Sequence, residues 1–440
     1  MVLNSIKNLI KKMLVNRILK NTTIRRHFED RIYNPYDRIK MLKPIKITKI
    51  SESFEPDFKN KFSLITPVKN EEEGIEEFIR SVENQIALPE EFIIVDGGST
   101  DRTVEMINKI MQSCKLKIRL LEIKSKSISE QRNLAIRTAN NEHIILADAG
   151  NILDKNYCSN MIGVFSKYED ADLVGAIYYA LHSEFSNYFI YDWMSFNEWD
   201  GFLPAGKTMA IKKSLALEIG GFPEYLAYAG EDALFDVNYR KVSKHWVFNS
   251  RAFVYWDIPR TMESTIKKFI SYGIGDGESG WGDQRFYSAL MRSRINLNFI
   301  DNSPVTNLMF TGYLKGRDKR GEIEFSKRNI KRVNLCIFKK TLHVSDDVIN
   351  RLKEMHDKNE KVIYLSCDRD FSEEKYINID FTLLELYDIN DFILEDFWRR
   401  YGSYNESISI FYEDIAMTNI VARKLVDTLF SMNLSIIEWQ

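Results

Sequence analysis

The sequence is poor in cysteine, and its four cysteines follow no recognisable spacing. Cys114, Cys158, Cys336 and Cys367 are scattered over a chain of 440 residues. Neither a metal site nor a disulfide framework has this spacing, so the cysteines favour a reducing compartment such as the cytoplasm.

Long apolar runs and an excess of charge of one sign are also missing. No run approaches the roughly 20 apolar residues of a membrane-spanning helix, and the N-terminus lacks the apolar core of a signal peptide. The formal net charge is −2, so no global basic field favours nucleic acid as a partner. The length is sufficient for two or three domains.

Residues 1–60 precede the region around which the chain is organised, and we expect a basic helix and an arm there. Within residues 5–20 apolar residues recur at helical spacing, and every charged residue is basic. Such a helix can lie on an anionic membrane surface or pack on the protein itself. Its all-cationic charge favours the membrane, at the inner face of the cell membrane.

A strand, a loop and a helix are predicted where the organising region begins. The apolar residues 62–66 are followed by Pro67, which cannot donate to a β ladder, so we expect the strand to end there. Glu71 stands just before the predicted helix, whose positive end suits glutamate. Apolar residues at helical spacing within residues 75–82 then predict an amphipathic helix.

A second strand is predicted at residues 92–95, and it ends in a carboxylate. Asp96 is followed by Gly97 and Gly98. Ligands of open α/β sheets bind at the carboxyl edge of the strands. A carboxylate at that edge can accept the N–H groups of a nucleobase, and glycines let the backbone approach the ring.

These residues resemble the start of a family 2 glycosyltransferase, which has the GT-A fold. Thr66-Pro67, an acidic residue at Glu71, and the Val-Asp-Gly-Gly-Ser-Thr-Asp run of residues 95–101 occur in the order of that family. The resemblance implies that Asp96 binds the nucleotide base and that Thr66, Pro67 and Glu71 border the nucleotide. The alternative is an ordinary βαβ unit with a polar turn.

Arg132 continues the resemblance further along the chain. Arg132-Asn133 stands at the start of a predicted helix, as an Arg-Asn pair does in the family, where the arginine approaches the nucleotide. A guanidinium at that place can reach a base carbonyl or a phosphate. The alternative is a surface arginine on an amphipathic helix.

Asp148 stands where the family has its Asp-x-Asp metal site, directly after a predicted strand at residues 143–147. The resemblance implies Mg²⁺ or Mn²⁺ at Asp148, bridging the pyrophosphate of the donor and stabilising the leaving group. Gly150 replaces the second aspartate, as in a subgroup that carries Asp-Ala-Gly. A metal site completed by waters, Asn151 or Asp154 and a metal-independent site with basic side chains therefore both stay open.

The expected catalytic residues follow a glycine-flanked lysine and a Gly-Gly-Phe-Pro-Glu turn at residues 220–224. By resemblance, Lys207 offers positive charge to the pyrophosphate. Glu231-Asp232 matches the Glu-Asp motif, in which the aspartate is the general base of an inverting transfer and the glutamate shapes the site. A hydroxyl is a poor nucleophile until a carboxylate takes its proton. The alternative for these acids is a solvated helix N-terminus.

A glycine-rich stretch, residues 273–277, follows a helix that we expect to end at Tyr272. Such a stretch could close over the site as a lid or serve as a flexible linker. The Gln-x-x-Arg-Trp signature of processive members is absent, which favours transfer of a single sugar. The aromatic segment at residues 185–199 suits sugar rings and cores alike, and we favour a core.

The domain organisation follows from the extent of the resemblance. We expect a GT-A domain over residues 61–285 with a mixed, mostly parallel sheet between helices, then a helical linker over residues 286–330. Strands and helices alternate again over residues 331–440, which predicts a smaller α/β domain with a parallel sheet. Partner binding or oligomerisation is the role expected for it.

The sequence therefore predicts an inverting glycosyltransferase that moves one sugar from a nucleotide-sugar donor, expected to be UDP-linked. The expected acceptor is a glycan or a lipid-linked glycan in surface polysaccharide biosynthesis. One alternative is an inactive nucleotide-sugar-binding or scaffold protein. A sugar-phosphate nucleotidyltransferase is less favoured, because residues 66–71 lack the glycine-rich basic loop that this class needs after the first strand.

Overall fold

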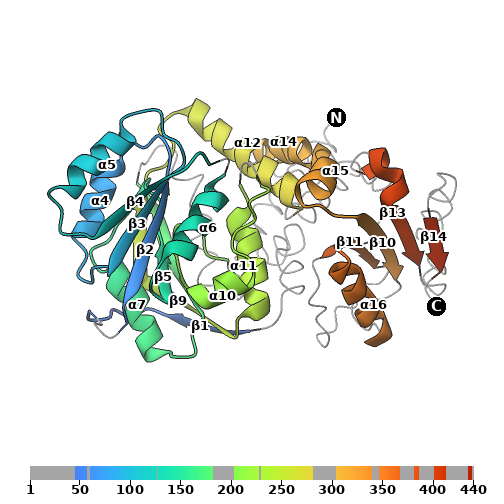
Figure 1. Ribbon diagram of the computed structural model, residues 1–440, viewed down its shortest axis with the longest axis horizontal. Coiled ribbons are helices and arrows are strands. Elements are labelled where there is room, and N and C mark those ends of the chain that lie inside the picture. The colour runs from blue at the N-terminus through green and yellow to red at the C-terminus, as the bar shows by residue number, and fades with distance from the viewer. Residues whose placement is uncertain are drawn as a thin grey trace, which may run out of the picture.

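The computed structural model describes residues 45–56, 60–125, 127–181, 203–226, 229–280, 304–338, 346–366, 381–385, 401–412 and 435–438. The expected basic helix at residues 5–20 and the aromatic segment at residues 185–199 lie outside these residues. The described chain forms two sheets, and the helices α12, α14 and α15 lie between them (Figure 1). No described helix is both long and apolar enough to span a membrane.

The first sheet has the strand order β1-β9-β7-β8-β5-β2-β3-β4, with β6 paired to β9. Its strands are β1 Lys46–Ile50, β2 Phe62–Val68, β3 Glu91–Asp96, β4 Ile118–Glu122, β5 His143–Leu146, β6 Asn151–Leu153, β7 Leu173–Ala180, β8 Met209–Lys212 and β9 His245–Trp256. β8 runs antiparallel to β5 and β7, and β6 runs antiparallel to β9, while the other pairs are parallel. This is the mixed, mostly parallel sheet that was expected.

Helices cover both faces of this sheet (Figure 1). One face packs against α4 Ile75–Glu83, α5 Thr103–Met111 and α7 Tyr157–Lys167, and the other against α6 Ile128–Thr138, α10 Lys213–Glu218 and α11 Glu231–Val242. Neighbouring residues of a strand point to opposite faces, so Leu64 joins the first apolar cluster and Ile65 the second. Strands buried on both faces explain the continuous apolar runs of the sequence.

Pro67 does not end its strand, contrary to expectation. β2 stays paired with β3 as far as Val68, whereas its pairing with β5 stops at Ile65. Pro67 therefore lies where one edge of β2 no longer has a ladder partner, and a proline without an N–H is tolerated there.

The sheet also begins earlier in the chain than the expected boundary at residue 61. β1 pairs in parallel with β9, from Lys46 beside His245 to Ile50 beside Asn249. Residues 46–50 are therefore part of the sheet rather than of an arm that precedes it.

The glycine-rich stretch at residues 273–277 is neither a lid nor a linker. It lies inside α12, Met262–Ser279, which packs along α14, Pro304–Asp318. A Cβ atom at Gly273 would collide with the carbonyl oxygen of Met309, and one at Gly277 with backbone atoms of α14. The glycines therefore let two helix backbones come into contact.

The second sheet is entirely parallel, with the order β12-β11-β10-β13-β14. Its strands are β10 Arg332–Phe338, β11 Glu360–Ser366, β12 Phe381–Glu385, β13 Ile408–Tyr412 and β14 Ser435–Glu438. α15 Arg320–Glu322 and a π-helical turn, Ile323–Lys327, lead into it, and α16 Asp346–Asp357 connects β10 to β11. The alternation of the sequence over residues 331–440 predicted such a parallel sheet.

Candidate active site

Most of the predicted site residues meet at the carboxyl edge of the first sheet. β2, β3 and β5 are parallel neighbours, so the chain beyond each of them opens at the same edge. Asp148 lies two residues beyond β5. The loop that follows is fixed to the end of β9, because the Asp257 N–H donates to the Gly150 carbonyl at 3.0 Å.

Arg132 lies at the centre of the predicted residues, and its side chain is only 3% exposed. Nη1 donates to Glu231 Oε1 at 2.8 Å, and Nη2 donates to Asp148 Oδ1 at 3.0 Å. Burial alone would lower the pKa of Arg132, but the carboxylates of Asp148 and Glu231 outweigh it and raise the pKa. The arginine therefore stays charged and joins two motifs that are far apart in the sequence, rather than pointing at open solvent.

Asn133, for which the sequence predicted no role, holds the Gly-Gly-Phe-Pro-Glu turn in place. Its Nδ2 donates to the Phe222 carbonyl at 2.9 Å and to Glu224 Oε1 at 2.8 Å, and its Oδ1 accepts from the Phe222 N–H at 2.7 Å. Gly221 has a φ of 82°, and a Cβ atom there would collide with Asn133. The Arg-Asn dipeptide thus holds the acids with one side chain and the turn before them with the other.

Asp232 lies in the first turn of α11, where the helix dipole favours an anion. Its Oδ2 accepts from the Gly206 N–H at 3.2 Å, and its Oδ1 accepts from the Ala233 N–H at 2.8 Å. These backbone bonds leave lone pairs on both oxygens. The carboxylate is therefore oriented and retains the capacity to accept a proton.

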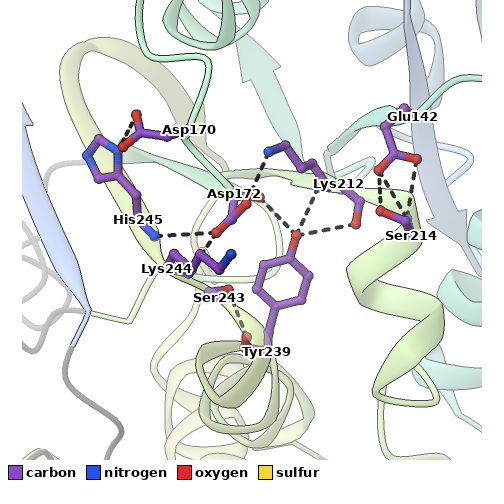
Figure 2. A network of polar contacts seen from close by, with 9 residues as sticks. All are labelled: Glu142, Asp170, Asp172, Lys212, Ser214, Tyr239, Ser243, Lys244 and His245. Atoms are coloured by element: carbon purple, nitrogen blue, oxygen red, sulfur yellow. Dashed lines mark hydrogen bonds and ion pairs between the residues drawn. The ribbon is translucent and has the colours of Figure 1, made fainter.

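The C-terminal end of α11 is anchored to the sheet by a polar network, shown in Figure 2. The Tyr239 hydroxyl donates to the Asp172 carbonyl at 2.9 Å and accepts from the Lys212 N–H at 2.9 Å. The Asp172 carboxylate accepts from the Lys244 N–H at 2.7 Å and from Lys212 Nζ at 3.1 Å. Because α11 is fixed at this end, the acids at its other end keep their position over the sheet edge.

Two glutamates near the centre have raised pKa values. Burial and the charge of Asp232 raise the pKa of Glu231 to about 7, against the opposing effect of Arg132. Burial and the charge of Asp148 raise the pKa of Glu71 to about 7, against the opposing effect of Lys268. The charges of Asp148 and of Lys268 on α12 therefore both act on Glu71, so the three side chains share the same surroundings.

Asp96 is buried and holds its own loop. Its carboxylate accepts from the N–H groups of Gly98 and Ser99, at 2.9 and 3.0 Å, and from the Ser99 hydroxyl. Thr66 is fully buried in β2 beside Pro67, and among the described residues its hydroxyl has no hydrogen-bond partner. These three residues lie at the carboxyl ends of β2 and β3, where the sequence predicted the nucleotide site.

Lys207 lies next to Gly206 and is directed at aromatic rings. Its Nζ is 3.1 Å from the ring centroid of Trp256 and 4.2 Å from that of Tyr178. Lys268 reaches the same Trp256 ring at 5.9 Å. No pattern in the sequence indicated Lys268, because a lysine inside an amphipathic helix is ordinarily a surface residue.

The carboxylates present do not fit the two-aspartate metal site that the resemblance implies. Gly150 has no side-chain oxygen, and one carboxylate oxygen of Asp148 is bound by Arg132. Across the described part of the chain, no three His, Cys, Asp or Glu side chains are grouped so that they could hold a metal ion.

Comparison with known proteins finds a matching family model and several similar proteins. Residues 63–224 match the model of Glycosyl transferase family 2. The chain is 33% identical over 97 residues to the poly(ribitol-phosphate) beta-N-acetylglucosaminyltransferase TarS of Staphylococcus aureus strain Mu50, covering 22% of this chain and 17% of TarS. It is 27% identical over 130 residues to the glycosyltransferase GlyG of Streptococcus pneumoniae serotype 4, covering 29% of this chain and 42% of GlyG. The chain thus spans less than half the length of either relative.

Solved structures show weaker likenesses. The S. aureus TarS 1–349 complex with UDP-GlcNAc is 16% identical with a TM-score of 0.40, covering 60% of this chain and 83% of that one. The Pyrobaculum calidifontis mannosyltransferase PcManGT, in complex with GDP-Man and Mn²⁺, is 15% identical with a TM-score of 0.44, covering 71% and 82%. Taken with the motifs at the sheet edge, the family match shows that residues 63–224 of this chain belong to glycosyl transferase family 2.

Proposed function

We propose that this chain is a glycosyltransferase that moves one sugar from a nucleotide-sugar donor to a hydroxyl group of a glycan or lipid-linked acceptor. The observation that carries the proposal is the constellation of Asp232, Glu231, Arg132 and Asp148 at the carboxyl edge of the sheet. The two adjacent carboxylates Glu231 and Asp232 lie beside the buried cation Arg132, directly after a segment that matches family 2, and this arrangement supports group transfer rather than binding alone.

In the proposed reaction Asp232 is the general base. Its carboxylate takes the proton of the acceptor hydroxyl as the oxygen attacks the anomeric carbon. The new C–O bond forms while the bond to the donor phosphate breaks, and the nucleoside diphosphate leaves with that electron pair. Attack from the face opposite the leaving group inverts the anomeric carbon.

The other predicted residues contact the donor or position the catalytic groups. Asp96, Thr66, Pro67 and Glu71 border the nucleotide in this proposal. Uracil is the proposed base, because a TarS structure has been solved with UDP-GlcNAc. Glu231 and Arg132 keep the general base Asp232 and the loop of Asp148 in position.

The biological setting is proposed from the relatives. TarS is by name a poly(ribitol-phosphate) glycosyltransferase, and GlyG is by name a glycosyltransferase. A polysaccharide of the cell surface is therefore the proposed destination of the sugar. We propose that the enzyme works in the cytoplasm at the inner face of the membrane, with residues 5–20 meeting the anionic surface.

The alternative is an inactive nucleotide-sugar-binding or scaffold protein, and Gly150 is the observation that motivates it. Turnover distinguishes the two. The test is release of nucleoside diphosphate from a panel of nucleotide sugars by the full chain, in wild type and in Asp232→Asn.

We expect Asp232→Asn to lower kcat by about 10²- to 10⁴-fold, as loss of a general base does, with nucleoside diphosphate affinity within about threefold of wild type. Asp170→Asn, at an exposed aspartate on the opposite edge of the sheet, is the matched control and should keep full activity. Full turnover in Asp232→Asn would contradict the assigned base, and no turnover of any sugar by the wild type would favour the scaffold.

A further inference from the structure

Lys268 is a cation beside this edge of the sheet, and it lies beyond the segment matched by the family, residues 63–224. It lies in α12, whose start is fixed by a capping box between Thr261 and Ser264. Further along the helix, a Cβ atom at Gly275 would collide with the backbone of Ala229, directly before α11. The helix therefore packs against the chain just before Glu231 and Asp232, and Lys268 has a defined place beside the site.

The ammonium group of Lys268 lies near two aromatic rings, and no carboxylate of the described residues forms an ion pair with it. Its Nζ is 5.5 Å from the ring centroid of Tyr272 and 5.9 Å from that of Trp256. The charge of Lys268 also acts on Glu71, in the loop after β2. A ring attracts a cation without neutralising it, so the positive charge stays available to an anion.

A second ammonium group shares the same ring. Lys207 Nζ lies 3.1 Å from the Trp256 ring centroid, and Lys207 follows Gly206, which donates to Asp232. Trp256 is the last residue of β9, and the next residue, Asp257, is bonded through its N–H to the Gly150 carbonyl. Two lysines thus converge on the tryptophan beside the loop in which glycine replaces the second aspartate.

The nucleoside diphosphate is the most negatively charged part of the proposed donor, and its charge grows as the sugar leaves. Preorganised cations at the developing charge lower the barrier to departure. The carboxylates near Gly150 do not fit a two-aspartate metal site, so this charge requires another partner.

We propose that Lys268 binds the diphosphate of the donor together with Lys207, and that this lysine pair on Trp256 stabilises the departing nucleoside diphosphate. The inference rests on the proposed function, because it assumes a nucleotide-sugar donor at this edge. It adds a binding residue on α12 to those that the motifs indicated.

The test is calorimetric titration of the full chain with UDP, GDP, CDP and ADP, followed by the monophosphate and the nucleoside of the base that binds. Lys268→Met is compared with Lys267→Met, a neighbour on the same helix that is 74% exposed and ion-paired to Glu263 at 2.6 Å. Thermal unfolding of each variant verifies the fold, and Lys268→Arg tests for rescue by another cation.

We expect Lys268→Met to weaken diphosphate binding by about 10- to 100-fold, as loss of a charge-assisted contact does, and to leave nucleoside binding unchanged. Lys267→Met should bind like the wild type, and Lys268→Arg should recover most of the affinity. If the wild type binds a diphosphate and a folded Lys268→Met binds it equally well, this inference alone is overturned. If the wild type binds no nucleoside diphosphate, the proposed function falls and this inference falls with it.

Discussion

The carboxyl group of Glu71 makes the stability of the protein depend on pH. Burial and Asp148 raise the pKa of this half-buried carboxyl group to about 7, so the folded protein holds its proton more tightly than the unfolded chain does. Above pH 7 the ionised form of Glu71 lowers the free energy of unfolding. This loss of stability disappears as the pH falls towards 4.5, where Glu71 is protonated in the unfolded chain as well.

Glu71→Gln should therefore raise stability at pH 8 by about 1–3 kcal/mol and leave it unchanged near pH 4.5. Thermal unfolding at the two pH values measures this directly. Glu73→Gln, at an exposed neighbour, is the control and should have no effect at either pH. A gain that is equal at both pH values would show that the carboxylate charge is not its cause.

Single residues also show where prediction from sequence stops. The motifs identified Arg132, Asp148, Glu231 and Asp232 separately, and the structure joins Arg132 to Asp148 and Glu231. Arg132 and Glu231 are 99 positions apart, so only the tertiary fold could reveal their ion pair. The roles of Asn133 and Lys268 were missed for the same reason, because each depends on a partner that is distant in the sequence.

Among the elements, α12 departs furthest from the prediction. Glycines are poor helix formers, so residues 273–277 were expected to leave the helix. Close packing against α14 overrides that propensity, because Gly273 and Gly277 let the two backbones touch. The continuous helix then carries Gly275 to the chain before α11, which makes α12 part of the site's support.

Gly275→Ala tests this role of α12. The added Cβ atom would collide with the Ala229 carbonyl oxygen, so the chain leading to Glu231 and Asp232 must shift. We expect about 1–3 kcal/mol of destabilisation, as overpacking typically causes, together with loss of turnover. Gly74→Ala, where the nearest atom to the new Cβ would be 3.8 Å away, is the control for stability. A fully active Gly275→Ala would contradict the supporting role.

At the scale of the whole molecule, a buried ion pair attaches the π-helical turn after α15 to the second sheet. Lys361 on β11 contacts Glu324 in the π-helical turn after α15, and Arg328 lies 3.3 Å from the same glutamate. Glu324 is 1% exposed. Alternation of strands and helices predicted both sheets, but pairing of β1 with β9 and this link depend on contacts that periodicity does not encode.

Lys361→Met should destabilise the chain by about 2–4 kcal/mol, because among the ion-pair partners in the described residues the buried Glu324 charge then keeps Arg328 alone. Denaturant unfolding measures the loss. The double variant Glu324→Gln with Lys361→Met removes both charges of the pair and should recover part of the stability. Equal stability of Lys361→Met and the wild type would show that attachment of the π-helical turn to the second sheet does not depend on this pair.

The central claim is that the edge around Arg132 and Asp148 binds a nucleotide-sugar donor. The most direct measurement is calorimetry of the full chain with UDP, GDP, CDP and ADP, each with Mn²⁺ and with a chelator. We predict that one diphosphate binds, UDP by our proposal, and that the chelator changes its affinity by less than about threefold, because lysines carry the phosphate charge. A strict requirement for Mn²⁺ would contradict the assignment of that charge to Lys207 and Lys268. Binding of none of the four would contradict the central claim itself.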